Sequence, residues 1–355
     1  MVVGAGLAGL TAADELARAG ASVRVLESRS RVGGRIWTVA PEGPESAALF
    51  DLGATWVWAD QEALLGLAAE LGVETYAQHR EGRVLAEIPE LPPHPVEVPP
   101  ASPAELRFAG GAQTVCERLA ARLPTGSLTL GATVETIADE GGRLAVLGLG
   151  PDGELALTTD AVVVALPPRL ALDRVAFEPG LPADVVSVMT ATPTWMGRAL
   201  KAIAVYDRPF WRDDGSSGLA FSTVGPLIEV HDACSADGSV AALWGLVSED
   251  HAFRDLDGQT RAEQVLDQLA RLFGPQAAEP RGYFERDWSQ DPNTADRIVW
   301  LGGELLGYGH PAFAQAQFDG RLAFAGAETE AVGGGHMEAA VRSGRRAAHL
   351  LLLAD

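Results

Sequence analysis

The first residues of the chain alternate in the order of a strand, a glycine turn, a helix and a second strand. Val2-Val3 has the character of a strand end, and apolar residues then recur at helical spacing as far as Gly20. A second apolar run, residues 21–26, ends at Glu27. This order predicts a βαβ unit of the dinucleotide-binding type. The first strand is short, so either its register begins late or residues before Met1 are missing from the sequence.

Three glycines and one acid each have a physical task in such a unit. Gly4 permits a tight turn, Gly6 lets the backbone approach a pyrophosphate, and Gly9 lets the helix pack on the strand. The helix N-terminus offers free N–H groups to the anion. Glu27, about 20 residues further on, can accept hydrogen bonds from a ribose diol. A turn with a purely structural role is the weaker alternative, because the flanking elements have the right order.

Later apolar segments predict further elements. Residues 61–71 have the periodicity of an amphipathic helix. Short runs at 128–130, 144–147 and 155–157 predict a meander, and the run 161–166 predicts a strand. These segments indicate a mixed α/β chain.

A second glycine pattern lies inside the meander. Gly148-Leu149-Gly150-Pro151-Asp152-Gly153 also spells the dinucleotide motif, but Pro-Asp-Gly is a tight-turn sequence between alternating strand residues. We therefore expect a hairpin there and no second dinucleotide site.

One apolar strand carries a charge. Residues 199–206 are apolar on both alternating faces except at Lys201, which indicates a buried strand. Burying an ammonium is unfavourable, so Lys201 snorkels to water, pairs with an acid, or loses its proton and serves chemistry. The strand alone leaves structural and functional roles open. Residues 89–103, in contrast, contain seven prolines and predict a loop or extended connector.

Composition limits the class of protein. The chain has 355 residues, enough for two domains, and 47% hydrophobic with 21% charged residues is typical of ordinary folded proteins. The formal net charge of −21 disfavours nucleic acid as a partner. That charge favours solubility more than the steering of an amine substrate.

The cysteines and the lack of a long apolar run bear on location. Cys116 and Cys234 lie far apart without further Cys or His at metal spacing, so we expect neither a disulfide nor a metal site. No apolar run approaches the ~20 residues of a membrane span. Met1 leads directly into the glycine motif, without a signal peptide. We expect a cytoplasmic protein without a membrane anchor.

Two motifs extend the nucleotide-binding unit beyond Glu27. Gly33-Gly34-Arg35 forms a turn whose flanking arginines can add charge-assisted hydrogen bonds to phosphate. Phe50-Asp51-Leu52-Gly53-Ala54-Thr55-Trp56 follows it. With both motifs, the chain resembles the flavin-containing amine oxidase (monoamine oxidase-like) family, in which the Asp-Leu-Gly segment passes beside the pyrophosphate and the flavin ring. The resemblance implies FAD as the cofactor.

The resemblance continues in the middle of the chain. Residues 196–212 are similar to the family segment whose lysine holds a water against flavin N5, which gives Lys201 that role. Trp288 matches a family tryptophan near the site. Residues 289–298 contain no cysteine where covalent members carry the one that bonds the flavin, so the resemblance implies non-covalent FAD.

The last family motif lies near the C-terminus. Residues 322–344 resemble it closely, which implies that Glu328 and the backbone of Met337 contact the cofactor. His336 stands where monoamine oxidases have one of two tyrosines that sandwich the substrate amine, and it either binds substrate, acts as a base or only begins a helix. Further aromatic or imidazole side chains can replace the missing wall, namely Trp300, Tyr308 and His310.

The predicted site therefore has two parts. The expected catalytic residues are Lys201, His336 and Trp288. The expected cofactor-binding residues are Gly4, Gly6, Leu7, Ala8, Gly9, Glu27, Ser28, Arg29, Gly33, Gly34, Arg35, Gly53, Ala54, Thr55, Trp56, Val134, Gly326, Glu328, His336 and Met337.

The family also implies a fold. It is an α/β fold with an FAD-binding Rossmann-like domain (a parallel sheet of the glutathione-reductase/p-hydroxybenzoate-hydroxylase type) and a second, mainly antiparallel-sheet substrate domain. The expected FAD-binding domain comprises residues 1–78, 107–199 and 287–355, and the substrate domain 79–106 and 200–286. Most members carry a long helical insertion that roofs the substrate cavity. This chain is a short member that lacks most of it.

The implied reaction is oxidation of an amine by hydride transfer to flavin N5, with O2 as the acceptor and imine or aldehyde plus H2O2 as products. The partners are thus a small-molecule substrate and O2. Two alternatives stay open: a related flavin enzyme acting on a C–C bond or a reduced nicotinamide, and an FAD-binding protein without turnover. The substrate, the oligomeric state and a roof supplied by a partner chain are also left open.

Overall fold

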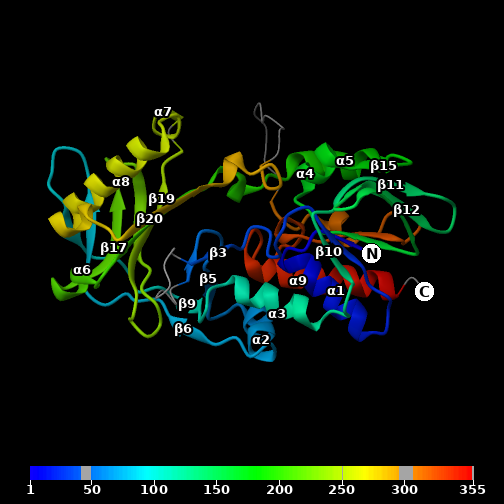
Figure 1. Ribbon diagram of the computed structural model, residues 1–355, viewed down its shortest axis with the longest axis horizontal. Coiled ribbons are helices and arrows are strands. Elements are labelled where there is room, and N and C mark those ends of the chain that lie inside the picture. The colour runs from blue at the N-terminus through cyan, green and yellow to red at the C-terminus, as the bar shows by residue number, and fades with distance from the viewer. Residues whose placement is uncertain (41–48, 250, 296–306, 354–355) are drawn as a thin grey trace.

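The strands and helices gather in two lobes with a narrower middle (Figure 1). The computed structural model describes residues 1–40, 49–249, 251–295 and 307–353. Both chain termini lie in the lobe that contains α1 and α9, and the other lobe contains β17, β19, β20 and α8. The predicted α/β class is confirmed, because one sheet is parallel and the largest sheet is mainly antiparallel.

The βαβ unit at the start of the chain forms the centre of the parallel sheet. Its strand order is β10-β2-β1-β14-β21, and every neighbouring pair is parallel. The second strand is shorter than the predicted run 21–26, because the strand pairings begin only at Val25. The five strands are β1 (Val2–Val3), β2 (Val25–Glu27), β10 (Leu128–Leu130), β14 (Val162–Val164) and β21 (Leu322–Phe324).

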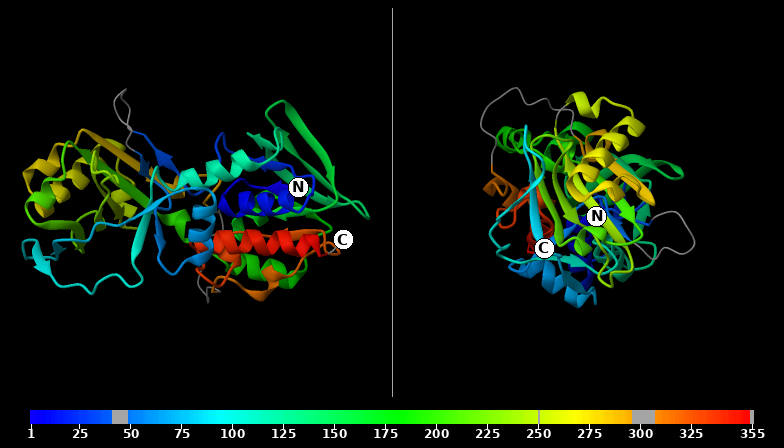
Figure 2. Two further views of the ribbon diagram at one scale, coloured as in Figure 1. Left: turned by 90° about the horizontal axis from the view of Figure 1, so that it is seen from below. Right: turned by 90° about the vertical axis from the view of Figure 1, so that its left-hand side faces the viewer.

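Apolar residues cover both faces of this short sheet. One face packs against α1 (Leu7–Arg18) and α9 (Met337–Leu352), which lie side by side in Figures 1 and 2. Gly344 brings these two helices into close contact, since a Cβ atom there would lie 2.4 Å from the carbonyl oxygen of Ala8. The other face packs against the predicted meander. Burial on both faces explains why the strands are continuous apolar runs.

The meander differs in one strand from the prediction. Residues 128–130 join the parallel sheet beside β2, because the turn at Gly131 separates them from the next strand. The first strand of the meander is instead β11 (Thr133–Asp139), which pairs with β12 (Leu144–Gly150). The predicted hairpin at Pro151-Asp152 is confirmed, because Gly150 pairs with Gly153 between β12 and β13 (Gly153–Thr159). A short parallel strand, β15 (Ala176–Glu178), completes this sheet.

The largest sheet has seven strands in the order β20-β16-β19-β18-β17-β7-β8. The predicted buried strand is confirmed as β16, all of whose residues are buried. Helix α8 (Gly258–Phe273) packs on one face, while the other face turns toward the middle of the molecule. The other strands are β7 (Arg83–Glu87), β8 (His94–Val96), β16 (Leu200–Tyr206), β17 (Ser216–Ser222), β18 (Leu227–Asp232), β19 (Ala241–Val247) and β20 (Gly282–Asp287).

The proline-rich segment, predicted as a loop or extended connector, contains one short strand. Strand β8 pairs with β7 at the edge of the seven-stranded sheet, where Pro95 is tolerated because an edge strand does not need every N–H group. The sheet thus combines residues 83–96 with residues 200–287. This agrees with the segments assigned above to a substrate domain, although the domain boundaries stay a prediction.

The middle of the molecule holds two small sheets. One consists of β3 (Thr38–Val39) and β4 (Phe50–Asp51); the other has β5 (Trp56–Trp58), β6 (Thr75–Ala77) and β9 (Glu105–Phe108). The predicted helix at 61–71 is α2 (Glu62–Glu70). The remaining α-helices are α3 (Gln113–Arg122), α4 (Pro168–Arg174), α5 (Ala183–Ala191), α6 (Phe210–Asp213) and α7 (His251–Arg254).

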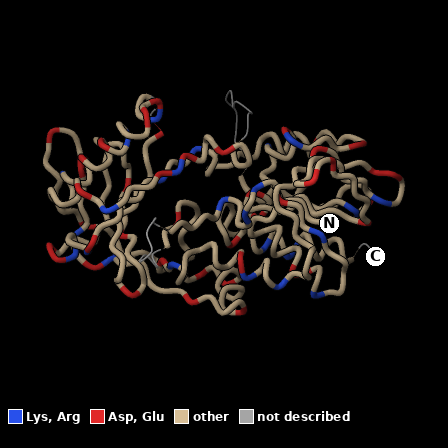
Figure 3. The backbone as a smooth tube through the Cα atoms, viewed as in Figure 1, with Lys and Arg blue, Asp and Glu red and all other residues tan. Residues whose placement is uncertain are grey.

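Asp and Glu residues are spread along the backbone of both lobes (Figure 3). Within the described ranges, no helix combines the length and the hydropathy needed to cross a membrane.

The contact of α1 with α9 can be tested at Gly344. We expect Gly344→Ala to lower the free energy of unfolding by about 1–3 kcal/mol, because its methyl group would overlap the backbone of α1. The matched control is Gly66→Ala on α2, where an added Cβ meets nothing within 4 Å and should stabilise by about 0.5–1 kcal/mol. Urea unfolding of the three proteins measures both effects. Equal stability of Gly344→Ala and the natural protein would contradict the close contact.

Candidate active site

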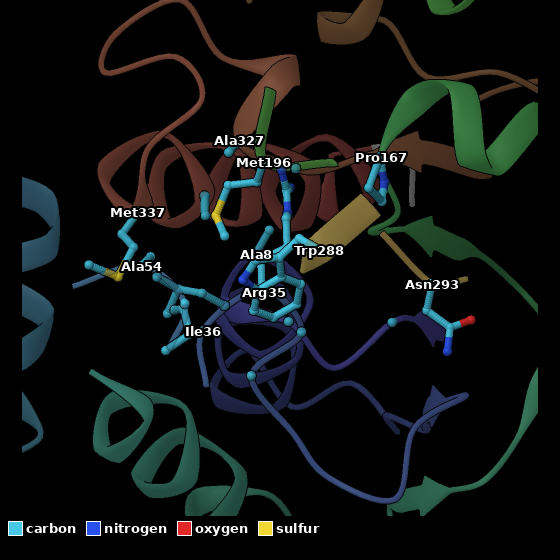
Figure 4. Close-up of a pocket in the computed structure, with 18 of the residues that line it drawn as sticks. Ala8, Arg35, Ile36, Ala54, Pro167, Met196, Trp288, Asn293, Ala327 and Met337 are labelled. Carbon is cyan, nitrogen blue, oxygen red and sulfur yellow. The ribbon is translucent and has the colours of Figure 1, made fainter. Parts of the chain in front are cut away.

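An elongated cavity of about 390 Å³ connects the parallel sheet with the seven-stranded sheet. Its volume lies within the usual range of small-molecule sites. At one end it is lined by residues at the carboxyl ends of parallel strands, among them Gly4, Glu27 and Ala165. In Figure 4 the lining runs from Met337 at one side, past Arg35 and Trp288, to Asn293 at the other.

The N-terminus of α1 faces this cavity without a side-chain cap. Gly6 is the residue before the helix, makes no side-chain cap, and lines the cavity together with Leu7 and Ala8. A Cβ atom on Gly6 would meet no protein atom within 4 Å. The protein itself therefore does not require glycine there, whereas a ligand close to the backbone would.

Glu27 stands at the nucleotide end of the cavity. Its carboxylate is buried and accepts hydrogen bonds from the backbone N–H groups of Ala5 (2.7 Å) and Arg29 (2.8 Å). A carboxylate has about four lone-pair positions, so these two bonds fix its orientation and leave capacity for hydroxyl groups of a ligand. This arrangement suits the ribose-binding role predicted for Glu27.

Arg29, at this end of the cavity, is held by a segment far along the chain. The Arg29 guanidinium donates to Asp291 Oδ1 (2.7 Å) and to Thr294 Oγ1 (2.9 Å). Asp291 also forms an ion pair with Arg286, whose guanidinium lies 5.3 Å from the ring centre of Trp288. These contacts connect the turn after β2 with the end of β20.

Arg35 and Glu328 form an ion pair behind the cavity wall. Arg35 lines the cavity, and its guanidinium donates to both carboxylate oxygens of Glu328, one of them at 3.0 Å. Glu328 is fully buried and does not reach the cavity surface. The structure therefore places Glu328 behind Arg35, and its contact with the cofactor stays a prediction.

A second uncapped helix N-terminus lies at the other end. His336 precedes α9 and forms no side-chain cap, and both His336 and Met337 line the cavity. His336 Nδ1 lies 3.0 Å from the carbonyl oxygen of Gly334, so in the neutral ring Nδ1 carries the proton and Nε2 is left as an acceptor. The ring meets Trp58 edge-on, with 5.2 Å between ring centres.

Lys201 lies on the cavity wall with neutral partners only. Its Nζ donates to the hydroxyl of Thr55 and to the carbonyl oxygen of Gly53 at 3.2 Å, and it lies 4.0 Å from the ring centre of Trp244. Among the described residues, no carboxylate forms an ion pair with it. Burial lowers the pKa of Lys201 from 10.5 to about 7, although the more distant carboxylates of Asp51 and Glu229 act in the opposite direction. A neutral amine is therefore accessible near pH 7.

Trp244 is placed between Lys201 and His231. Trp244 lies on β19, while Lys201 and His231 come from the neighbouring strands β16 and β18. The His231 ring stacks on Trp244 with 4.7 Å between ring centres. Arg80 lies 3.4 Å from His231 Nδ1 and can only donate, so Nε2 of the neutral ring carries the proton. Burial lowers the pKa of His231 and favours that neutral form.

Glu229 is the carboxylate at the Lys201 end of the cavity. It lies on β18 and lines the cavity, and its Oε2 lies 3.6 Å from His231 Nε2. Burial acts to raise the pKa of Glu229, but His231, Arg80 and Lys201 together lower it below its usual value. Glu229 is therefore an anion that faces the cavity.

The structure brings together nearly all of the predicted residues. Every predicted cofactor-binding or catalytic residue lines the cavity except Gly9 and Glu328. Gly9 serves the predicted packing role, because a Cβ there would lie 1.9 Å from the Gly4 carbonyl oxygen. Trp288 is fully buried and donates to the Leu52 carbonyl oxygen at 3.0 Å. The individual roles of these residues stay predictions.

The side chains predicted to replace the missing aromatic wall of the substrate site are not found on the cavity wall in the described part of the chain. Trp300 lies outside the described residues. Tyr308 packs against the backbone of Gly334 and Gly335 and does not line the cavity. His310 caps a short helix, since its Nδ1 accepts from the Ala312 N–H group at 3.2 Å. Trp58 takes the position beside His336 instead.

Sequence reasoning missed four lining residues at the Lys201 end, namely Trp58, Glu229, Trp244 and Leu246. Trp58 stands two positions after Trp56, and this strand spacing places both indoles on one face. Glu229, like Trp244 on β19, points to the same face of the sheet as Lys201, but only the observed register shows this. His231 stacks behind Trp244, outside the lining. The fourth lining residue, Leu246, pairs with both Lys201 and Glu229.

The cavity fits FAD. Two uncapped helix N-termini can bind electron-rich groups, one beside a glycine turn and one at the opposite end. Glu27 can bind a ribose, and the open space at Gly6 can accept a pyrophosphate. Within the described ranges, no group of three or more His, Cys, Asp or Glu side chains is arranged to bind a metal ion.

Known proteins resemble this chain over its full extent. The sequence matches the family described as flavin containing amine oxidoreductase over residues 7–90 and 96–352. Putrescine oxidase of Kocuria rosea is 29% identical, with 98% of this chain and 94% of the relative covered. Human amine oxidase [flavin-containing] B is 26% identical, with 99% and 85% covered. The alignment with the Kocuria protein spans 456 positions, so that relative has residues that this shorter chain lacks.

Solved structures resemble it as well. The structure described as wild-type putrescine oxidase bound to putrescine has a TM-score of 0.85 at 26% identity, with 99% of this chain and 98% of the other covered. Cyclohexylamine oxidase from Brevibacterium oxydans IH-35A has a TM-score of 0.86 at 22% identity, with 99% and 97% covered. The second likeness supports the fold.

The two glycines of the α1 turn should respond differently to alanine. We expect Gly6→Ala to fold normally but to bind FAD more weakly by on the order of tenfold or more, because the methyl group would project into the cavity. We expect Gly9→Ala to lower the melting temperature, because its Cβ would overlap the backbone of Gly4. Flavin titration and thermal unfolding of the apoproteins separate the two effects. A Gly6→Ala protein with normal FAD affinity would show that no ligand approaches there.

The protonation of Lys201 can be measured directly, because it is the single lysine of the chain. Protein labelled with ¹³Cε-lysine should give one resonance that titrates near pH 7. The lysine pKa is lower in the folded than in the unfolded chain, so the unfolded chain binds more protons between about pH 7 and 10.5. The free energy of unfolding should therefore rise with pH across this window, and Lys201→Met should remove that rise. A resonance that titrates near 10.5 would contradict the burial effect.

Proposed function

Since this chain belongs to the flavin-containing amine oxidoreductase family, we propose that it is an FAD-dependent oxidase of an amine substrate. The observation that carries the proposal is Lys201, an amine on the wall of a cavity that fits FAD, with no ion-pair partner in the described part of the chain. For a primary amine, the amine, O2 and water would give an aldehyde, ammonia and H2O2.

The cofactor would be held by backbone groups and a few charged side chains. Glu27 would bind the ribose, the first N–H groups of α1 the pyrophosphate, and the start of α9 the electron-rich edge of the flavin. Bound FAD supplies the acceptor for a hydride from the carbon beside the amine. Residues 289–298 contain no cysteine, so FAD would be non-covalent and acid precipitation would leave the flavin in solution.

The protein groups would position the reactants and handle protons. Lys201 would hold a water molecule with its amine at the cavity surface, next to Thr55. His336 Nε2 would accept a hydrogen bond or a proton from the substrate amine, since Nδ1 is directed to a carbonyl oxygen. Trp288 and Trp244 would keep this end apolar. An apolar surrounding favours the neutral amine, which is the form that loses a hydride.

Glu229 supports a substrate with a second positive group. Glu229 is an anion, and both it and Lys201 pair with Leu246 on the strand between them. Two strand spacings separate their Cα atoms by about 10 Å. A cationic group a few bonds from the reacting carbon could pair with it. Putrescine oxidase, whose structure with putrescine resembles this chain, binds such a diamine.

The expected domain division, O2 as acceptor and a cytoplasmic location also belong to the proposal. The strand segments 83–96 and 200–287 of the largest sheet support the division. Two buried free thiols, Cys116 and Cys234, suit a reducing compartment.

The first experiment is anaerobic bleaching of the flavin absorbance by a panel of amines, with NADH, NADPH and a porphyrinogen as contrasts. We expect rapid bleaching by an amine, and by a diamine faster than by the monoamine of equal length. Bleaching only by a contrast compound would discard amine oxidation. A flavin that no donor bleaches would favour a binding protein without turnover.

Glu229→Gln tests the second part of the proposal. The substitution removes the charge at nearly constant volume, so the preference for the diamine over the matched monoamine should fall by on the order of tenfold. The control is Glu154→Gln, an exposed position on the β12–β13 hairpin. An unchanged preference in Glu229→Gln would remove this carboxylate from substrate recognition.

A further inference from the structure

We propose that Lys201 is also a carbonyl-binding group, whose side-chain amine condenses reversibly with an aldehyde in the cavity. The aldehyde released by the proposed amine oxidation would be one such ligand, so its natural source rests on the proposed function. The reactivity of the amine does not rest on the proposed function, because any small aldehyde that enters the cavity can be the ligand.

The first argument is the set of partners around Nζ. Both hydrogen bonds go to neutral acceptors, the Thr55 hydroxyl and the Gly53 carbonyl, and no described carboxylate pairs with the amine. The Thr55 hydroxyl itself donates to the Gly53 carbonyl at 3.2 Å, which leaves its oxygen free to accept from Lys201. A neutral amine has two N–H groups, so these two acceptors satisfy it completely and leave its lone pair for another atom.

The second argument is the surface on which the amine lies. Lys201 lines the cavity between apolar residues, with Ala199 before it and Leu246 opposite on β19. Desolvation in an apolar pocket is a recognised way to make lysine a nucleophile for carbonyl compounds. The lowered pKa of Lys201 agrees with this environment.

The third argument is the contrast with the other cations on the cavity wall. Arg29, Arg35 and Arg174 are guanidinium groups, and each is paired with a carboxylate, that of Asp291, Glu328 or Asp173. Lys201 is the single lysine of the chain. The cavity therefore presents one primary amine, and none of the described carboxylates is its counterion.

The chemistry balances without any further reagent. The Nζ lone pair forms a bond to the carbonyl carbon, and one N–H proton moves to the carbonyl oxygen to give a carbinolamine. That oxygen then leaves as water with the second N–H proton, and a C=N bond forms. Protonation of the imine restores one N–H group, which the Thr55 hydroxyl or the Gly53 carbonyl can accept. Hydrolysis reverses both steps, so the aldehyde would act as a reversible covalent inhibitor that takes Lys201 out of its water-holding role.

The test uses the FAD-loaded protein, butanal and sodium cyanoborohydride at pH 7, with intact mass and peptide mapping as readouts. We expect one reduced butyl group on the peptide that contains Lys201, formed on the order of tenfold faster than on free Nα-acetyllysine. The other primary amine of the chain is that of Met1, which donates to the Ala161 carbonyl oxygen at 2.7 Å and is read on a separate peptide. An unmodified Lys201 peptide overturns the proposal.

Two variants test whether the missing ion pair, and not a position on the cavity wall alone, makes the Lys201 amine reactive. Lys201→Met should lose the adduct, and the double variant Lys201→Met with Arg35→Lys should not regain it, because a lysine at position 35 would face the Glu328 carboxylate. Equal labelling of position 35 would overturn the argument from missing counterions.

A second arm replaces butanal by the amine that bleaches the flavin, in air. An adduct in both arms supports both proposals. An adduct with butanal, in a protein whose flavin no amine of the panel bleaches, keeps the carbonyl site and rejects the proposed oxidase. Turnover of an amine with no adduct in either arm rejects the carbonyl site alone.

Discussion

The close packing of α1 on α9 is the constraint on which the rest of the site depends. Gly344 allows the backbones of the two helices to touch near Ala8, one residue into α1. Both helices begin without a side-chain cap, and the first residues of both line one cavity. Four N–H groups at each helix start lack intrahelical partners, so this packing directs two sets of oriented donors into the two ends of one cavity. Without the contact, the two donor sets would not share a ligand.

Around that core, charged side chains join segments that are distant in sequence. The Arg29–Asp291 and Arg35–Glu328 pairs link the N-terminal turns with residues more than 250 positions later. Such buried pairs are weak evidence for stability, because desolvation offsets much of their attraction. Their clearer effect is geometric. Arg35 donates to both oxygens of Glu328, and Arg29 donates to Asp291 and to Thr294, so the direction of each side chain is fixed. The cavity wall is thereby ordered by residues that do not all touch its interior.

The glycine turns, the helix at residues 61–71 and the buried strand at Lys201 were all readable from the sequence, because each has a local signature of spacing or composition. The place of residues 128–130 was not, since a three-residue apolar run carries no information about which sheet it joins. Glu229, His231 and Trp244 were missed for a related reason. Their relation to Lys201 is set by the register of three strands, and register depends on long-range packing that no short pattern reveals. His310 and Tyr308 show the converse, because residues that look like site residues are used for a cap and for packing.

The single lysine also affects how the molecule meets its surroundings. All its other basic side chains are arginines, so every positive side chain on the surface, apart from histidine, is a guanidinium group. Lys201 is buried in β16. The folded surface of the described residues thus offers no ε-amino group for acetylation or for an isopeptide bond, and lysine-directed crosslinkers would find no target outside the cavity. Its exterior is inert to lysine chemistry, and that chemistry is confined to the interior.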